Sequence, residues 1–197
     1  MLSLQRKYEL ILAAEEAFTR SISKAVFEKP AISLWMVLIP ILLVHFIQSM
    51  QTYKNDRLTF QKEYMRSRRK ALDLATEAVT HGSAPDIADW VRQATPSPDL
   101  APSYRTWLQE MIAYYTALLR ADGDDFQSLV HAAYADRDDF TAALEKLRAA
   151  ENAFNDACKP QLAATPGAME VIELIEERSR TLRRELASAV YDHPKKP

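Results

Sequence analysis

Residues 31–47, with the sequence AISLWMVLIPILLVHFI, contain no Asp, Glu, Lys or Arg, although such residues make up 26% of the whole chain. Extended to residue 50, the segment has 20 residues. This length corresponds to about 30 Å of helix, which matches the hydrocarbon thickness of a bilayer. We therefore predict a transmembrane segment at residues 31–50. Pro40 would kink such a helix, a defect that membrane helices tolerate and soluble helices rarely contain.

Two other interpretations fit the same segment. Its length is marginal for a membrane span, and Pro40 and His45 interrupt its apolar character. Residues 31–47 are therefore also compatible with a buried central helix of a soluble bundle or with a re-entrant membrane segment. His45 lies near the end of the segment, where we expect its ring to reach the membrane interface rather than to relay protons or bind a cofactor.

Aromatic and basic residues flank the apolar segment. Trp35 and Tyr53 would lie about 27 Å apart along a helix, close to the two headgroup layers. Residues 54–70 contain seven bases and two acids. The positive-inside rule then places the C-terminal part of the chain in the cytoplasm and the first thirty residues across the membrane, whereas a re-entrant segment would leave both on one side. The predicted interface residues are Trp35, Tyr53, Lys54, Arg57, Arg66, Arg68, Arg69 and Lys70.

The charge of the chain is unevenly distributed. Residues 54–70 carry a net charge of +5, and residues 71–197 carry −8. A basic collar would thus lie against the membrane, with an acidic body beyond it. We expect the collar to contact anionic lipid headgroups or acidic neighbouring subunits. Nucleic acid is not an expected partner, because the acidic body would repel a polyanion.

The composition predicts an all-α protein. The chain has only three glycines, each at the end of a periodic segment, and Ala, Leu, Glu and Arg dominate between them. We divide the chain into an N-terminal amphipathic helix (1–30), the transmembrane segment (31–50), a basic juxtamembrane stalk helix (51–81), a short helix with a Pro-rich hinge (82–102), a helical bundle that ends in an antiparallel coiled-coil-like hairpin (103–191), and a disordered tail (192–197).

The N-terminal helix and the stalk each carry an apolar stripe that requires a partner. Residues 4–28 place Ile11, Phe18 and Ile22 on one side of a helix. Glu15 lies on the same side, either as a solvated edge residue, which is the usual state of Glu, or as a buried partner for a base. The stalk has a heptad-like stripe that Arg57, Ser67 and two alanines weaken. This impurity favours packing within the chain over pairing with a second copy.

In the bundle, a six-residue pattern occurs twice, as ADGDDF at 121–126 and ADRDDF at 135–140. The economical interpretation is two helix starts, capped by Asp122 and Asp136. The six aspartates are alternatively ligands for Ca²⁺ or Mg²⁺, but neither block has the twelve-residue loop with a terminal Glu that calcium hands need. We also expect a Ser83 capping box and a central helix after Pro102.

Two long helices are expected at the end of the bundle. The first, residues 138–158, has an alanine-rich stripe on which Cys158 is a small core residue rather than a reactive thiol. A turn follows at residues 159–167, because it contains two prolines. The last helix pairs Glu176 with Arg180 on its polar side. Its apolar positions are in heptad spacing, namely Ile172, Ile175, Ser179, Leu182, Leu186 and Ala189.

No motif in the sequence indicates catalysis. The four histidines form no His-x-x-x-His or Glu-x-x-His pair, and neither a glycine-rich phosphate loop nor a Gly-x-Ser-x-Gly elbow is present. We therefore expect no enzyme activity, cofactor or metal. An enzyme or cofactor carrier that uses the aspartate blocks or His45 is the least favoured hypothesis, because the signatures of an active site are absent.

The leading functional hypothesis is a single-pass membrane-anchored helical adaptor, scaffold or accessory subunit of a membrane complex. It would contact lipids through its basic collar, and other subunits or a second copy through its helical stripes. The alternative is a soluble or peripheral helical binding protein, chaperone-like or lipid-binding, in which residues 31–47 are shielded in the bundle.

Overall fold

The computed structural model describes residues 2–28, 57–95, 97–163 and 167–192, and over these residues the chain is helical, without strands. This confirms the predicted all-α fold. The described residues form seven α-helices and one short 3₁₀ helix: α1 (Leu4–Glu28), α3 (Arg57–His81), α4 (Ala88–Ala94), η2 (Pro98–Leu100), α5 (Ala101–Arg120), α6 (Phe126–Ala133), α7 (Arg137–Leu162) and α8 (Ala168–Tyr191).

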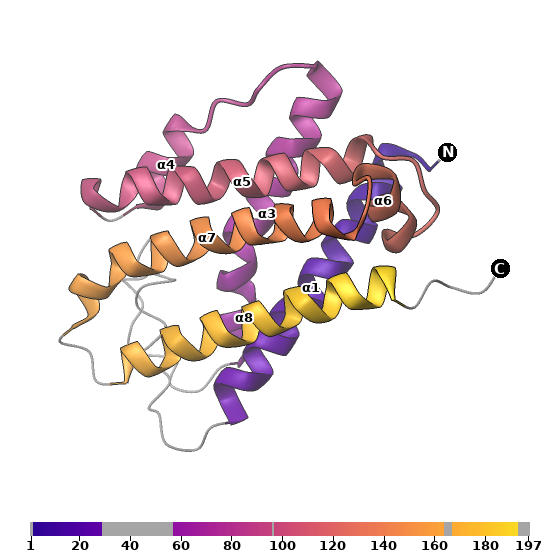
Figure 1. The fold of residues 1–197 in the computed structure, drawn as a ribbon. Helices are drawn as coiled ribbons and strands as arrows, with labels where there is room; N and C mark the ends of the chain where they lie inside the picture. The colour runs from indigo at the N-terminus through magenta and orange to yellow at the C-terminus, as the bar shows by residue number, and fades with distance from the viewer. Residues whose placement is uncertain (1, 29–56, 96, 164–166, 193–197) are drawn as a thin grey trace.

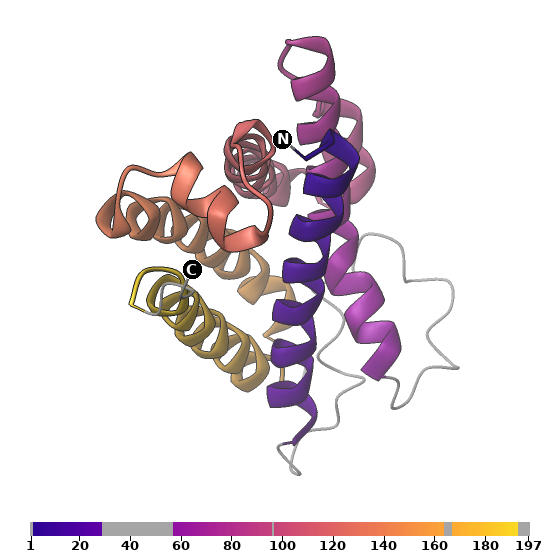
Figure 2. The same cartoon turned by 90° about the vertical axis from the view of Figure 1, so that its right-hand side faces the viewer.

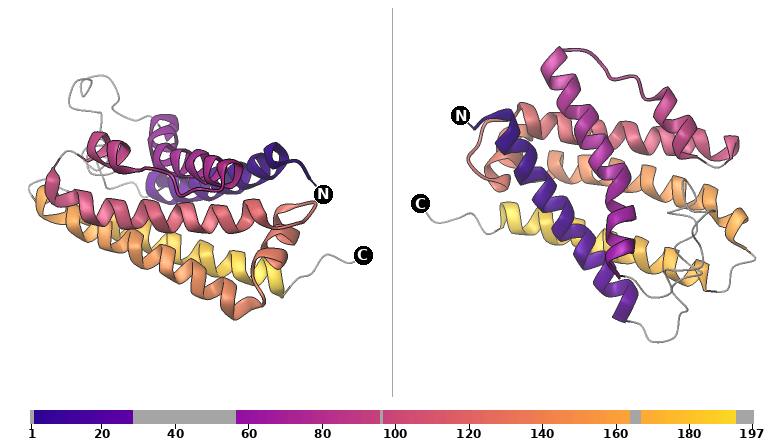
Figure 3. Two further views of the ribbon diagram at one scale, coloured as in Figure 1. Left: turned by 90° about the horizontal axis from the view of Figure 1, so that it is seen from above. Right: turned by 180° about the vertical axis from the view of Figure 1, so that it is seen from behind.

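The long helices form two layers. In Figure 1, α5, α7 and α8 lie side by side, each antiparallel to the next, and α1 and α3 cross behind them. Figure 2 shows α1 next to α3 on one side of the molecule, with α7 and α8 on the other. Seen from above in Figure 3, α3 and α4 lie over α5. The apolar core fills the space between the layers.

Helix α5 lies at the centre of this core, as its wide apolar face predicts. It packs against α3, α7, α6 and α1. Leu108, Met111, Tyr115 and Leu118 are completely buried. The expectation that Pro102 occupies the first turn is also confirmed, since the helix begins at Ala101.

Helix α3 forms one wall of the bundle. Its buried face contacts α1 and α5 of the same chain, so the packing within the chain that its impure stripe predicts is confirmed. The residues assigned to a stalk are therefore part of the bundle from Arg57 onward. A second, smaller apolar cluster joins α1, α3 and α8 through Ile22, Phe60 and Ile175.

The end of α1 lies beside the start of α3. The rings of Phe27 and Phe60 are 5.9 Å apart in an edge-to-face contact.

The predicted transmembrane segment and His45 lie outside the described residues. Among the helices that are described, none combines the length and the apolar character that a membrane crossing requires. Because α1 shares its core with α3 and α8, the prediction that the first thirty residues lie across a membrane from the bundle is incompatible with this packing.

The aspartate blocks cap helices, but not both at the predicted residue. Asp136 caps α7, where its carboxylate accepts a hydrogen bond from the backbone N–H three residues later at 2.9 Å. Asp125, not Asp122, caps α6, so that prediction is wrong. Ser128 explains the shift, because its backbone N–H donates to the Asp125 carboxylate at 2.8 Å while its hydroxyl accepts from the Asp125 N–H at 3.0 Å.

Two other predicted helix boundaries are wrong. Ser83 does not cap α4, which begins at Ala88. The backbone N–H of Ala88 donates instead to the Asp86 carboxylate at 2.9 Å. Helix α7 continues through Pro160 to Leu162, beyond the predicted turn at residue 159. The cost of a proline inside the helix is offset by burial, since Leu162 is completely buried.

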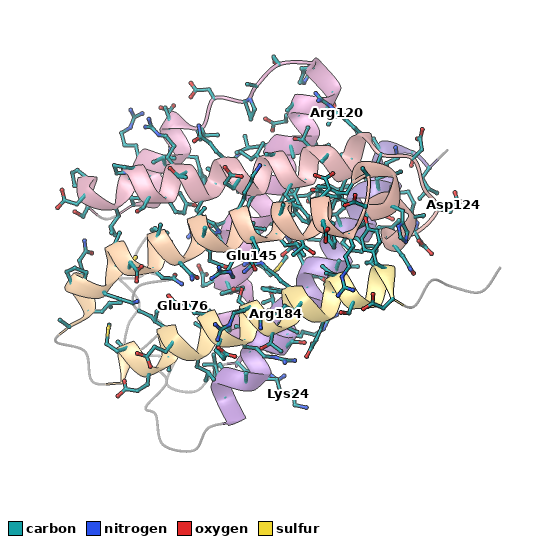
Figure 4. The ribbon with its side chains drawn as sticks, viewed as in Figure 1. Lys24, Arg120, Asp124, Glu145, Glu176 and Arg184 are labelled. Carbon is teal, nitrogen blue, oxygen red and sulfur yellow. The ribbon has the colours of Figure 1, made fainter. Side chains whose placement is uncertain are left out.

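The buried side of α8 leaves the predicted heptad after Ser179. Leu182 and Leu186 are only partly buried, and Ala189 is exposed. The buried positions instead follow a straight helix of about 3.6 residues per turn: Ala168, Val171, Ile172, Ile175, Ser179, Arg183, Ala187 and Val190. The predicted Glu176–Arg180 pair is also wrong. Glu176, labelled in Figure 4, accepts a hydrogen bond from Asn155 of α7 at 3.2 Å, and Arg180 pairs with Glu177.

Candidate functional site

A buried cluster of charges connects the two layers of the bundle. Its ionised members come from four helices and are almost inaccessible to solvent, with exposed side-chain fractions of 13% for Glu15, 2% for Arg68, 6% for Glu151 and 5% for Arg183. Two positive and two negative charges make the cluster neutral. Such burial is tolerated only when the charges are paired and hydrogen-bonded.

Arg68 of α3 bridges two carboxylates. Its two terminal nitrogens lie 2.9 Å from Glu15 of α1 and 2.7 Å from Glu151 of α7. The guanidinium also lies over the ring of Phe18, 4.9 Å from the centroid. A single side chain thus connects α3 to both of its neighbours through charge-assisted hydrogen bonds.

Glu151 is the centre of the cluster. One of its oxygens accepts from Arg68 and from the Tyr64 hydroxyl at 3.3 Å. The other accepts from Arg183 at 2.6 Å and from the Ser179 hydroxyl at 3.1 Å. Both carboxylate oxygens are therefore fully engaged, and neither is positioned to act as a base toward a substrate.

The arginines determine the ionisation of Glu151. Burial alone would raise the pKa of this carboxyl group, but Arg183 and Arg68, together with the hydrogen bonds from Arg183 and Ser179, lower the pKa to about 2. Glu151 is therefore ionised at neutral pH. The cluster acts as an electrostatic joint between α1, α3, α7 and α8.

The joint makes the stability of the protein sensitive to acid. An unfolded glutamate has a pKa of about 4.3. Because the folded pKa of Glu151 is lower, its ionised form contributes stability that is fully present above about pH 4.3 and is lost as the pH falls toward 2. We expect the difference in Tm between the wild type and Glu151→Gln to narrow over this range, in thermal unfolding at pH 7, 5 and 3. A difference that stays constant would contradict the assignment.

The sequence signals only part of this cluster. The alternative in which Glu15 is a buried partner for a base is the one that the structure shows. Arg68, predicted to contact the membrane interface, points into the protein instead. The sequence does not single out Glu151 or Arg183, although Arg183 follows Ser179 by one turn, the spacing of a shared helix face.

A second feature is a groove of about 770 Å³ on the outer face of α1 and α3. Of the predicted interface residues, the structure brings Arg66, Arg69 and Lys70 together here. Arg57, the first residue of α3, donates to Ser23 at 3.3 Å, and Trp35, Tyr53 and Lys54 lie outside the described residues. We call this feature the basic groove, defined by Arg20, Leu58, Lys62, Arg66, Arg69, Lys70 and Trp90.

The groove contains more positive than negative charge. Its five bases face three acids, Glu16, Glu63 and Asp73. Glu16 is shared by Arg69 at 3.4 Å and Arg20 at 3.9 Å.

The remaining acids are also occupied. Glu63 lies 3.8 Å from Arg66, and Asp73 accepts a hydrogen bond from the Tyr8 hydroxyl at 2.8 Å. Within the described residues, no carboxylate lies within 4.0 Å of Lys62 or Lys70. The groove therefore presents two lysines whose charges are not neutralised by an ion pair with any described carboxylate.

Trp90 of α4 lines the groove. The Arg66 guanidinium and the Lys70 ammonium lie 5.8 and 5.7 Å from the centroid of its ring. Its indole N–H donates to the Tyr104 hydroxyl of α5 at 2.9 Å, which fixes the ring against the core. Trp90 thereby orients two cations toward the groove.

Neither feature resembles a catalytic or metal centre. The described residues contain no group of three or more His, Cys, Asp or Glu side chains arranged for a metal ion. Cys158 is buried, as predicted, and burial raises the pKa of its thiol to about 12, which keeps it protonated. Comparison with protein-family models, curated proteins and solved structures finds no significant match to this chain.

Proposed function

We propose that the protein is a non-catalytic, membrane-associated helical adaptor or accessory subunit of a membrane complex. The observation that supports this proposal is the position of the charge-free residues 31–47, which are inserted between two helices whose ends meet at Phe27 and Phe60. The bundle buries its apolar residues on either side of this insertion. The insertion is therefore the part of the chain best suited to contact lipid.

The length of the insertion limits how it enters a membrane. Residues 29–56 separate α1 from α3. Two full crossings need about 40 residues of helix, and one crossing would separate α1 from the core that it shares with α3. We therefore replace the single crossing with a re-entrant arrangement, in which the segment enters and leaves the bilayer on the side of the bundle. Pro40, near the middle of the segment, suits the turn that this arrangement needs.

The adaptor part of the proposal rests on the surface of the bundle. Leu58 is the only large hydrophobic side chain that the described residues expose, so the apolar stripes are used within the chain. Partner subunits would thus bind to charged faces, where residues 71–197 carry a net charge of −8. The proposal is non-catalytic because the central carboxylate, Glu151, is held by two arginines.

Membrane fractionation tests the proposal. We expect the full chain to remain in the membrane pellet after alkaline carbonate extraction. The variant Leu42→Arg/Leu43→Arg should be released, because each arginine at membrane depth costs about 2.5–3.5 kcal/mol. Gln48→Arg/Ser49→Arg, at the edge of the segment, is the matched control and should stay in the pellet.

The sidedness of the two chain ends provides the second measurement. Tags at the N- and C-termini should be digested together, or protected together, when sealed vesicles are treated with protease. Tags on opposite sides would restore the single crossing and would require α1 to leave the bundle. Release of the wild type by carbonate would refute the membrane segment and favour the peripheral binding protein.

A further inference from the structure

We propose that the basic groove binds the phosphate-bearing headgroups of anionic membrane lipids, an inference that rests on the proposed membrane association. The first reason is charge. Glu16 is occupied by two arginines, and Asp73 accepts from Tyr8. Lys62 and Lys70 have no carboxylate of the described residues within 4.0 Å, so they remain available to a phosphate. An anion entering the groove would gain two cations without breaking an existing ion pair.

The groove is also shaped for an interface between water and lipid. Trp90 holds Arg66 and Lys70 against its ring, and tryptophan is enriched at the headgroup layer because its indole is both apolar and polar. Leu58 also lines the groove, and 72% of its surface is exposed. A leucine beside lysines that no described carboxylate neutralises suits a lipid, which offers both a phosphate and an apolar chain.

The place of the groove in the chain agrees with this occupant. Leu58 is the second residue of α3 and lies eight residues after the end of the predicted membrane segment at residue 50. From Leu58 to Asp73 the groove follows α3 for about 22 Å. A headgroup layer is only about 6 Å thick. Helix α3 would therefore lie along the membrane surface, with the groove facing the lipid.

Partition of the full chain between vesicles and buffer tests the assignment. The probes are vesicles of phosphatidylcholine alone and vesicles that contain 30% phosphatidylglycerol. We expect the wild type to bind both, with a clear preference for the anionic vesicles. Lys62→Gln/Lys70→Gln should reduce this preference by roughly 25-fold, because each lysine near an anionic surface contributes roughly a fivefold gain and the two gains multiply. Binding to neutral vesicles should be unchanged.

Two exposed bases elsewhere on the bundle provide the matched control. Lys146 of α7 and Arg184 of α8, the latter labelled in Figure 4, carry the same total charge and do not line the groove. Lys146→Gln/Arg184→Gln should therefore keep the preference of the wild type. The control separates a loss of groove binding from a general loss of positive charge.

The outcomes distinguish this inference from the proposed function. If the wild type binds both kinds of vesicle equally, or if the two double variants behave alike, the groove is not a headgroup site, and an acidic protein segment becomes the better occupant. If the wild type binds neither kind of vesicle, the membrane association itself fails, and this inference fails with it.

Discussion

Replacing Glu151 with glutamine is expected to lower the free energy of unfolding by about 3–5 kcal/mol, because it leaves Arg68 and Arg183 buried without a full counter-charge. Glutamine keeps the size of the side chain, so packing changes little. For a chain of this length, the loss corresponds to a decrease in Tm of about 6–20 °C. Thermal unfolding of the full chain in mild detergent, followed by circular dichroism, measures it.

The control for Glu151 is a carboxylate in an exposed pair. Glu177 of α8 pairs with Arg180, with 57% and 44% of their side-chain surfaces exposed. Glu177→Gln should change the stability by less than about 1 kcal/mol, because water and salt screen an exposed pair. Equal effects of the two substitutions would refute the buried joint.

A triple substitution tests why the loss occurs. Arg68→Met, Glu151→Leu and Arg183→Met together replace three of the four buried charges of the cluster with apolar side chains. The fourth, Glu15, can turn toward solvent. Replacing a buried ion pair with apolar side chains is often neutral or stabilising by about 1–4 kcal/mol. We expect the triple variant to recover most of the stability that Glu151→Gln loses. A further loss would show that the charges themselves stabilise the fold.

Truncating Phe140 is the second substitution with a large expected effect. Its side chain is completely buried near the start of α7. Its ring lies 5.1 Å from Tyr134 and 6.1 Å from Tyr191 of α8. Phe140→Ala removes these contacts and leaves a cavity, so it should lower the free energy of unfolding by about 3–5 kcal/mol. Denaturant unfolding of the full chain measures the change.

The internal repeat supplies the matched control for Phe140. Phe126 occupies the equivalent place in the first aspartate block, but it is only partly buried. Phe126→Ala should therefore cost clearly less than Phe140→Ala. If the two truncations lower the free energy of unfolding equally, the burial of each ring does not determine the cost of removing it.

Helical periodicity predicts much of this fold. The extent of α1 and the central position of α5 follow from apolar residues at three- and four-residue spacing, because only such spacing aligns them on one face. The cap by Asp136 follows from local chemistry within one helical turn. These features depend only on residues that are close together in the sequence, so they can be predicted from it.

The remaining features depend on partners that are far apart in the chain. Arg68 is a surface-type residue by composition, and only its contacts with Glu15 and Glu151, 53 and 83 positions away, explain its burial. Asp122 and Asp125 are equally good caps until Ser128 selects the second. The basic groove likewise requires Trp90 to pack beside α3. The spacing of residues along one helix does not predict such contacts between side chains of different helices.

The packing of α1 against α8 has a consequence for the order in which the protein is made. Of the helices in the described residues they are the first and the last, and they contact each other across the smaller apolar cluster. During synthesis, α1 leaves the ribosome long before α8 exists. The part of the α1 apolar face that lies in the smaller cluster, with Ile22 and Val26, is thus fully covered only after α8 has been made, whereas α3 and α5 can cover the rest of that face earlier.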